Sequence, residues 1–294
     1  MQYLALILSM VTSTLLVIIL KYFSKFNINT FQAIVFNYIV CSSLGLAISD
    51  NSQLFTTQVV HQPWFYAAII LGCCFIGLFN LMGWTAQQYG LTAVSVANKL
   101  SLIIPVTLAF ILYNEKITAL KIVGILIALP AVYLATHKEE AQTQSRSKSG
   151  WIFTLILFLG SGFNDSVVNF TQKNYLQASQ FSSFVILIFG VAALIGICLL
   201  LYKVLFMQEQ LALRNILGGI VLGVPNYFSM YFLVKALAVK GWDSSAVFTI
   251  NNVGILLLSA ACGWIIFNEK FSLKNIIGII LACTAILLLM DRII

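Results

Sequence analysis

An acidic residue stands in the middle of an apolar segment: Asp165, in the stretch GSGFNDSVVNFTQKNY. Asp165, Asn169 and Gln172 recur at i, i+4 and i+7, so a helix would carry all three on one face. A charged side chain at a helix centre costs roughly 2.5–3.5 kcal/mol on insertion scales, so we expect this face to line a polar cavity. There Asp165 could bind a substrate ammonium group or take up a proton. The alternative is a structural tie to a buried base on another helix.

Lys99, in SVANKLSLIIP, is the expected counter-charge. Asn98 is its neighbour, and Ser95 lies one turn earlier on the same predicted helix. A lysine among neutral amides can clamp a carboxylate or a phosphate. The alternative is snorkelling, in which the long stem lifts the ammonium to the membrane interface. A pair between Asp165 and Lys99 would neutralise both charges in the empty protein, and a zwitterion would break it.

Milder polar patterns occur elsewhere. Asn80, Trp84 and Gln87 share one predicted helix face, and Tyr231 follows Pro225 at i+6. Aromatic and amide side chains suit an organic solute, whereas the alternative is hydrogen bonding between helices, worth about 0.6 kcal/mol per bond. The predicted substrate-binding residues are Asp165, Lys99, Asn98, Asn169, Asn252, Trp84, Tyr231 and Asn80, with Asp165 also predicted to couple a proton.

The composition indicates where these residues lie. The chain has 294 residues, of which 9% are charged and 61% hydrophobic, with a mean hydropathy of +0.99. Soluble domains carry about 25% charged residues, so we predict an all-α polytopic membrane protein. The net charge of +7 comes from basic residues at the ends of apolar runs, which is typical of membrane helices and not of nucleic-acid binding. All six cysteines lie inside apolar runs, and neither a metal site nor a cofactor is expected.

Polar clusters divide the chain into ten apolar stretches of about 18–25 residues, the length that a membrane helix needs. They lie near 3–22, 30–49, 64–87, 91–113, 118–136, 150–171, 180–203, 212–236, 244–267 and 272–290. The longest polar stretch, THKEEAQTQSRSKSG, reads as a linker. The predicted division is therefore residues 1–137, a linker at 138–149, and residues 150–294.

The two halves share a motif. YNEKITALKIVGI begins at Tyr113 and FNEKFSLKNIIGI begins at Phe267, each between the fourth and fifth stretches of its half. The same offset pairs Asn98 with Asn252, so the chain looks like an internal duplication. Since five is odd, the second half must enter the membrane from the opposite side. The predicted fold is two inverted five-helix repeats around a central cavity, an architecture of transporters.

The motif residues have a structural interpretation of their own. Asn114 and Asn268 are predicted to cap the helix that follows, and Glu115 and Glu269 to favour its positive N-terminal end. Small residues from Gly219 to Gly223 could serve packing within the chain or dimerisation, so monomer and homodimer both stay open.

These motifs resemble the drug/metabolite transporter superfamily, in particular its EamA-like ten-helix carriers. The likeness rests on the two Asn-Glu-Lys copies with Gly124 and Gly278, together with VKALAVKG at 234–241, and it extends over essentially the whole chain. It implies export or uptake of small polar metabolites, often amino acids, across a bacterial inner membrane, with both termini cytoplasmic. The basic residues favour the opposite orientation by nine to six; the expectation follows the resemblance.

A polytopic membrane protein could be a carrier, an intramembrane enzyme, or a structural or receptor subunit, but the last would require neither the intramembrane Asp165 nor the inverted duplication. A secondary carrier working by alternating access, with proton-coupled export as one form, fits best, and its partners would be a small solute, the lipid bilayer and a proton. A facilitator or exchanger of sugars, nucleotide sugars or organic cations is the alternative. An intramembrane lipid-modifying enzyme would need an acid–base set, yet the histidines, His61 and His137, both stand at segment ends. We therefore do not expect an enzyme.

Overall fold

The computed structural model describes residues 2–48, 57–105, 107–108, 118–136, 150–177, 180–237 and 244–288. All regular secondary structure in these ranges is helical. The helices are α1 (Gln2–Lys25), α2 (Thr30–Ile48), the 3-10 helix η2 (Thr57–His61), α3 (Pro63–Tyr89), α4 (Leu91–Leu100), α6 (Ala119–Thr136), α7 (Gly150–Asn174), α8 (Phe181–Phe206), α9 (Leu213–Leu237), α10 (Ser244–Phe267) and α11 (Leu273–Leu288). Except at α4, their ends agree with the predicted stretches to within a few residues. The predicted linker, residues 138–149, lies outside the described ranges.

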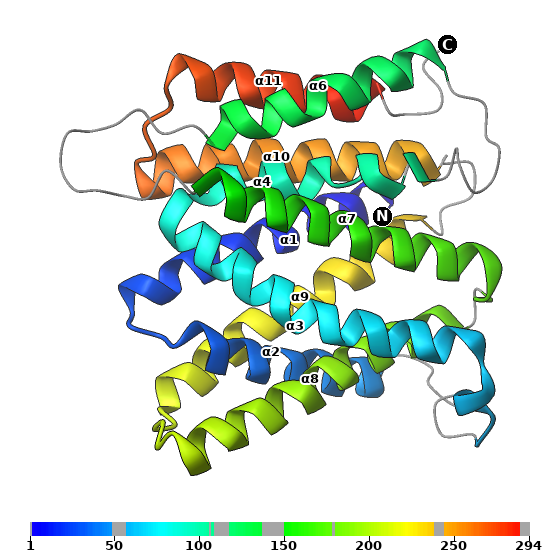
Figure 1. Cartoon of the computed structure of the whole chain (residues 1–294), viewed down its shortest axis with the longest axis vertical. Helices are drawn as coiled ribbons and strands as arrows, with labels where there is room; N and C mark the ends of the chain where they lie inside the picture. The colour runs from blue at the N-terminus through cyan, green and yellow to red at the C-terminus, as the bar shows by residue number, and fades with distance from the viewer. Residues whose placement is uncertain are drawn as a thin grey trace.

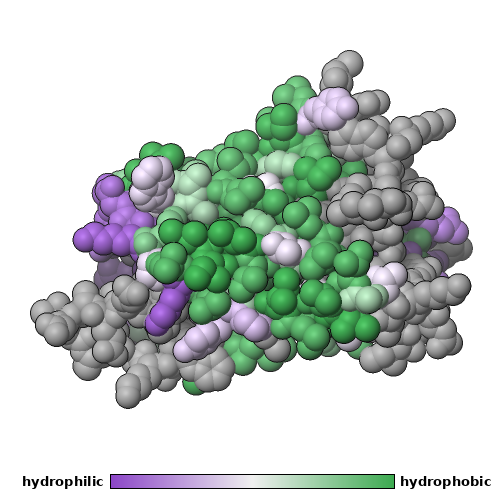
Figure 2. Space-filling view, turned by 90° about the horizontal axis from the view of Figure 1, so that it is seen from above, coloured by the Kyte–Doolittle hydropathy of each residue, from purple (hydrophilic) through white to green (hydrophobic). Residues whose placement is uncertain are grey.

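This is a multi-pass membrane protein. Within the described residues, seven helices are long and apolar enough to cross a bilayer: α1, α2, α3, α7, α8, α9 and α10. Residues 91–105, 122–135 and 273–288 form shorter apolar helices. Viewed from the side of α6 and α11, apolar side chains cover most of the middle of the surface and hydrophilic ones gather towards the ends (Figure 2). Such a band is what a lipid environment requires.

The helices run roughly perpendicular to the long axis of the molecule and are stacked along it, with α6 and α11 at one end and α2 and α8 at the other (Figure 1). Helices from the first part of the chain pack mainly on helices from the last part. In particular, α2 packs on α9 and α8, α3 on α8 and α7, α1 on α9 and α10, and α6 on α11. The two parts of the sequence therefore form one interleaved bundle.

Glycines bring several of these helices into backbone contact. A Cβ atom on Gly223 of α9 would lie 2.9 Å from the Asn37 carbonyl oxygen of α2, and one on Gly278 of α11 would lie 2.8 Å from the Ala135 Cα of α6. Asn275 strengthens the second contact by donating from its Nδ2 to the carbonyls of Leu134 (3.1 Å) and Ala135 (3.0 Å). The small residues of α9 thus serve packing within the chain.

The stretch predicted over 91–113 is interrupted: α4 ends at Leu100, a turn follows at 101–102, and helical conformation resumes at 103–105. In a continuous α-helix the Ser101 carbonyl would accept from the residue at 105, but Pro105 has no N–H. That carbonyl instead accepts from Ile104 at 2.9 Å, and the Ser101 hydroxyl donates to the Asn98 carbonyl at 2.6 Å. A tight turn therefore interrupts the helix inside the membrane region. Broken helices are tolerated there where protein or water satisfies the freed backbone groups.

Candidate functional site

The turn after α4 brings a serine hydroxyl onto the intramembrane carboxylate. Ser101 Oγ lies 3.0 Å from Asp165 Oδ2 on α7, and Asn98 Nδ2 donates to Ser161 Oγ of α7 at 3.2 Å. Asp165 is exposed, whereas Ser101 is fully buried. We call these four residues together with Lys99 the α4–α7 site. Three of its residues, Asp165, Lys99 and Asn98, were predicted from the sequence, and the turn after α4 adds Ser101 to them.

Lys99 is partly buried on α4 and interacts electrostatically with Asp165. Among the described residues, Lys99 and Asp165 do not form the direct ion pair that the sequence suggested. The hydroxyl of Ser101 occupies one carboxylate oxygen instead. Both charges therefore remain able to bind a further group.

Buried polar atoms without a partner occur on α4 and on two helices that pack against it. Within the described part of the chain, Ser95 Oγ on α4, Asn164 Oδ1 on α7 and Asn251 Oδ1 on α10 make no hydrogen bond. Asn252, predicted from the repeat, is 9% exposed beside Asn251, and α10 packs against α4. Buried polar groups are rarely left unpaired, so this region suits water or a polar solute. Asn164 and Asn251 were missed, although each adjoins a predicted residue.

The other predicted residues have more local contacts. Asn80 donates to the Ile76 carbonyl of its own helix at 2.7 Å. The Trp84 ring packs edge-on against Phe153, 4.5 Å between centroids. Lys235 Nζ lies 4.5 Å from the centre of the Tyr231 ring, and Asn169 is exposed on α7, one turn beyond Asp165. Their contacts indicate helix packing as readily as solute binding.

Gln87 has a structural role that can be tested. Its Nε2 donates to the Leu20 carbonyl of α1 (3.0 Å) and to Thr30 Oγ1 of α2 (2.8 Å). We expect Gln87→Leu to lower the free energy of unfolding by about 1 kcal/mol, the sum of two interhelical bonds. Its melting temperature in detergent should fall by a few degrees while solute affinity is unchanged. A changed affinity at unchanged melting temperature would show that Gln87 belongs to the solute site.

The Asn-Glu-Lys motif of the second half corrects one expectation. Asn268 has φ of 49° and ends α10; it does not cap α11. That helix begins with a reciprocal cap, in which Ser272 N donates to Asn275 Oδ1 (2.9 Å) and Asn275 N to Ser272 Oγ (3.3 Å). The side chain nearest the N-terminal turn can satisfy these donors best, and Ser272 is that residue. Asn114 and Glu115 of the first copy lie outside the described residues.

Glu269 does favour a helix N-terminus, but the helix is α4. Its Oε1 accepts from Leu91 N at 2.9 Å, its Oε2 accepts from Thr92 Oγ1 at 3.2 Å, and Lys21 of α1 forms an ion pair with it. We call Glu269, Lys21, Leu91 and Thr92 the Glu269 clasp. Glu269 is 177 to 248 positions away in the sequence from the residues that it contacts, so the pattern of neighbouring residues could not predict the clasp.

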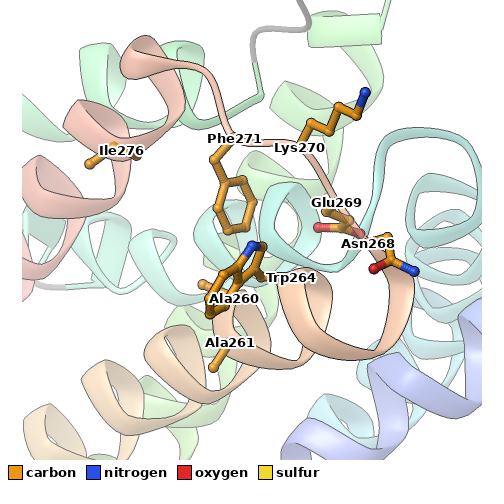
Figure 3. Close-up of a pocket in the computed structure, with 8 residues that line it drawn as sticks. All are labelled: Ala260, Ala261, Trp264, Asn268, Glu269, Lys270, Phe271 and Ile276. Carbon is orange, nitrogen blue, oxygen red and sulfur yellow. The ribbon is translucent and has the colours of Figure 1, made fainter.

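A pocket of about 670 Å³ opens beside the clasp, at the end of α10 (Figure 3). The side chains of Trp264 and Phe271 point toward one another across it, whereas Lys270 points away. Its lining residues are Ala260, Ala261, Trp264, Asn268, Glu269, Lys270, Phe271 and Ile276. The pocket thus shares no residue with the α4–α7 site.

Comparison with known proteins shows the fold and not the activity. No family model matches the chain. An uncharacterized protein of Haemophilus influenzae (strain ATCC 51907 / DSM 11121 / KW20 / Rd) is 28% identical over 297 residues, which cover 98% of this chain and 99% of the relative. A solved structure, described only as the crystal structure of a protein, is 14% identical with a TM-score of 0.57 and covers 95% of both chains. The same helical arrangement thus occurs in an experimental structure.

Proposed function

We propose that this protein is a secondary transporter of the EamA-like, drug/metabolite type, which moves small zwitterionic metabolites across the membrane by alternating access. The observation that carries the proposal is the exposed Asp165 carboxylate on a membrane helix, beside the interrupted end of α4. An exposed carboxylate facing lipid would be too costly, so its exposed surface belongs in a hydrated cavity. Broken helices at such depth are a feature of transporter binding sites.

The packing supports two inverted repeats. Pairing each helix of the first half with its mate in the second gives α1 with α7, α2 with α8, α3 with α9, α4 with α10 and α6 with α11. If each helix is replaced by its mate, the α2–α9 contact becomes an α8–α3 contact, and the α1–α10 contact becomes an α7–α4 contact. All four of these contacts are present in the structure. The mates α4 and α10 also pack on each other. In such folds the solute binds at this kind of repeat interface.

The charges favour a zwitterion as the solute. Asp165 is available to a substrate ammonium, and Lys99, which is near but unpaired with it, is available to a carboxylate. The unpaired Ser95, Asn164 and Asn251 atoms would bond to further polar groups of the solute. Amino acids are therefore the first solutes to test, with sugars, nucleotide sugars and organic cations as the alternative class.

Proton coupling is part of the proposal. The Ser101 hydroxyl has one proton and two nearby acceptors, the Asn98 carbonyl at 2.6 Å and Asp165 Oδ2 at 3.0 Å. When that proton points to the carbonyl, the Asp165 contact is a hydrogen bond only if the carboxyl carries a proton of its own. Loss or gain of that proton would thus change the turn after α4. Export from the cytoplasm across a bacterial inner membrane, with both termini cytoplasmic, is the orientation that accompanies this proposal.

The test is a ligand screen by thermal shift on purified protein, followed by counterflow in proteoliposomes for each hit. The panel contains amino acids, sugars, nucleotide sugars and lipophilic cations. A solute at a hundredfold excess over its dissociation constant stabilises the folded state by about 2.7 kcal/mol. We expect an amino acid to raise the melting temperature and to show counterflow. Stabilisation only by sugars or cations would overturn the zwitterion, and binding without counterflow would overturn transport.

A further inference from the structure

The Glu269 clasp joins the α10–α11 connection to the start of the helix that bears Asn98 and Lys99. We propose that Glu269 is a positioning residue that fixes the N-terminus of α4 and closes the α4–α7 site toward the membrane face where α1 ends and α2 begins. This inference rests on the proposed function, because closure on one face has meaning only for a protein that alternates its access.

The clasp is a well-defined, largely buried set of interactions. The side chains of Lys21 and Glu269 are only 17% and 15% exposed. The carboxylate bonds to the Leu91 N–H at the positive end of α4, where an anion is favoured. The Lys21 ammonium also lies 4.5 Å from the centre of the Phe267 ring, the last residue of α10. One carboxylate thus holds α1, α4 and α10 together.

Two glycines make room for this carboxylate. A Cβ atom on Gly90, which precedes α4, would lie 2.5 Å from Glu269 Oε1, and one on Gly263 of α10 would lie 2.5 Å from Oε2. Gly90 also has φ of 99°, a conformation that glycine adopts readily. In Figure 3 the Glu269 side chain lies beside Asn268 in the α10–α11 connection, and its Oε1 accepts from the first amide of α4. The surroundings therefore fit a carboxylate at this position.

The clasp must open if this face is to open. Alternating access rocks one repeat against the other around the solute site, and Glu269 belongs to the second half whereas Lys21, Leu91 and Thr92 belong to the first. A separation of the halves here would break all three bonds. The distance along α4 from Leu91 to Lys99 is eight residues, about 12 Å, so the clasp lies one membrane leaflet away from the proposed solute.

A second acid at the same end supplies a matched control. Glu209, in the α8–α9 connection, accepts from Asn29 Nδ2 (2.8 Å) and Gln32 Nε2 (2.9 Å), and Lys203 lies 3.5 Å from it. Its hydrogen bonds join the two halves, whereas its ion pair with Lys203 lies within the second half. Its recorded hydrogen bonds and ion pair go to Asn29, Gln32 and Lys203 and not to described residues of α4, so its loss tests the stability of this end without releasing the site.

The experiment measures the labelling rate of the thiol introduced by Ser95→Cys, at a buried position of α4. A membrane-impermeant maleimide is applied to intact cells and to inside-out vesicles, and peptide mass spectrometry separates this thiol from the native cysteines. Ser24→Cys, at an exposed position near the end of α1, identifies the relevant face. We expect Glu269→Gln to raise labelling from that face at least tenfold, Lys21→Met to raise it less, and Glu209→Gln to change it less than threefold.

Three results would overturn the inference: no increase with Glu269→Gln, an equal increase with Glu209→Gln, or an increase from the opposite face only. If Glu269→Gln fails to fold, as judged by its melting temperature, Lys21→Met and Glu269→Asp decide in the same assay. Labelling requires no solute, so its outcome is independent of transport. If the clasp controls labelling but no solute in the screen binds or is transported, the inference that Glu269 closes the site is kept and the proposed transport function is rejected.

Discussion

Asp165→Asn is expected to weaken solute binding roughly ten- to hundredfold while the protein stays folded. A hydrogen bond to a charged group contributes about 1.5–3 kcal/mol, and each 1.4 kcal/mol is a factor of ten in affinity. The asparagine oxygen would still accept from Ser101 Oγ, so the contact between α4 and α7 would persist. The measurement is the dissociation constant of the best solute from the thermal-shift screen, with the melting temperature of the empty protein beside it.

The matched control for this variant is Ser166→Ala. Ser166 adjoins Asp165, but its hydroxyl donates to the Gly162 carbonyl within α7 at 2.6 Å. It should bind the solute as the wild type does. An Asp165→Asn protein with wild-type affinity and a lower melting temperature would make Asp165 a tie between helices, and the solute site would have to be sought elsewhere. Proton-coupled transport should also vanish in Asp165→Asn, whereas solute exchange at equal concentrations should persist at reduced affinity.

Gly278→Ala is expected to lower the free energy of unfolding by about 1–3 kcal/mol, the usual cost of an added methyl group in a close-packed interior. The new Cβ would lie 2.8 Å from the Ala135 Cα. The obstacle is backbone, which cannot rotate away as a side chain can, so α6 and α11 would have to separate. Separation would also lengthen the bonds from Asn275 to the α6 carbonyls. The measurement is thermal unfolding in detergent.

Gly77→Ala on α3 is the control for Gly278→Ala. A Cβ atom there would meet no heavy atom within 4 Å, and alanine favours a helix over glycine by about 1 kcal/mol. We expect its melting temperature to equal or exceed that of the wild type. Equal losses at both glycines would mean that helix propensity or the detergent, and not the close approach of α6 to α11, determines the result.

Much of the fold could be predicted because the bilayer enforces it. Helices that cross a membrane need about 20 apolar residues and end where charged residues begin, so the C-terminal ends of α8 and α10 could be placed near Lys203 and Glu269. Asp165 could be selected for the same reason: an ionised group at that depth requires a function or a partner. Composition and spacing sufficed for both.

Other features depend on contacts that spacing does not encode. Pro105 was visible, but its effect falls on the Ser101 carbonyl four residues earlier, and the hydroxyl of Ser101 reaches Asp165 only because the helix turns there. Glu269 was assigned to the next helix, because a cap is normally supplied by a residue near in sequence. Its actual partner depends on which helices from the two halves lie side by side, and only the folded bundle determines that.

The Glu269 clasp also has a consequence for biosynthesis. The first amide of α4 donates its hydrogen bond to a residue 178 positions later in the chain. At about 5–20 residues per second, the ribosome needs on the order of 10–40 seconds to reach Glu269 after Leu91 has been made. During this interval α4, with its lysine and its uncapped end, must reside in the translocon or the bilayer without its final partner. A nascent chain arrested before residue 269 should therefore be the form of this protein that membrane quality-control proteases recognise first.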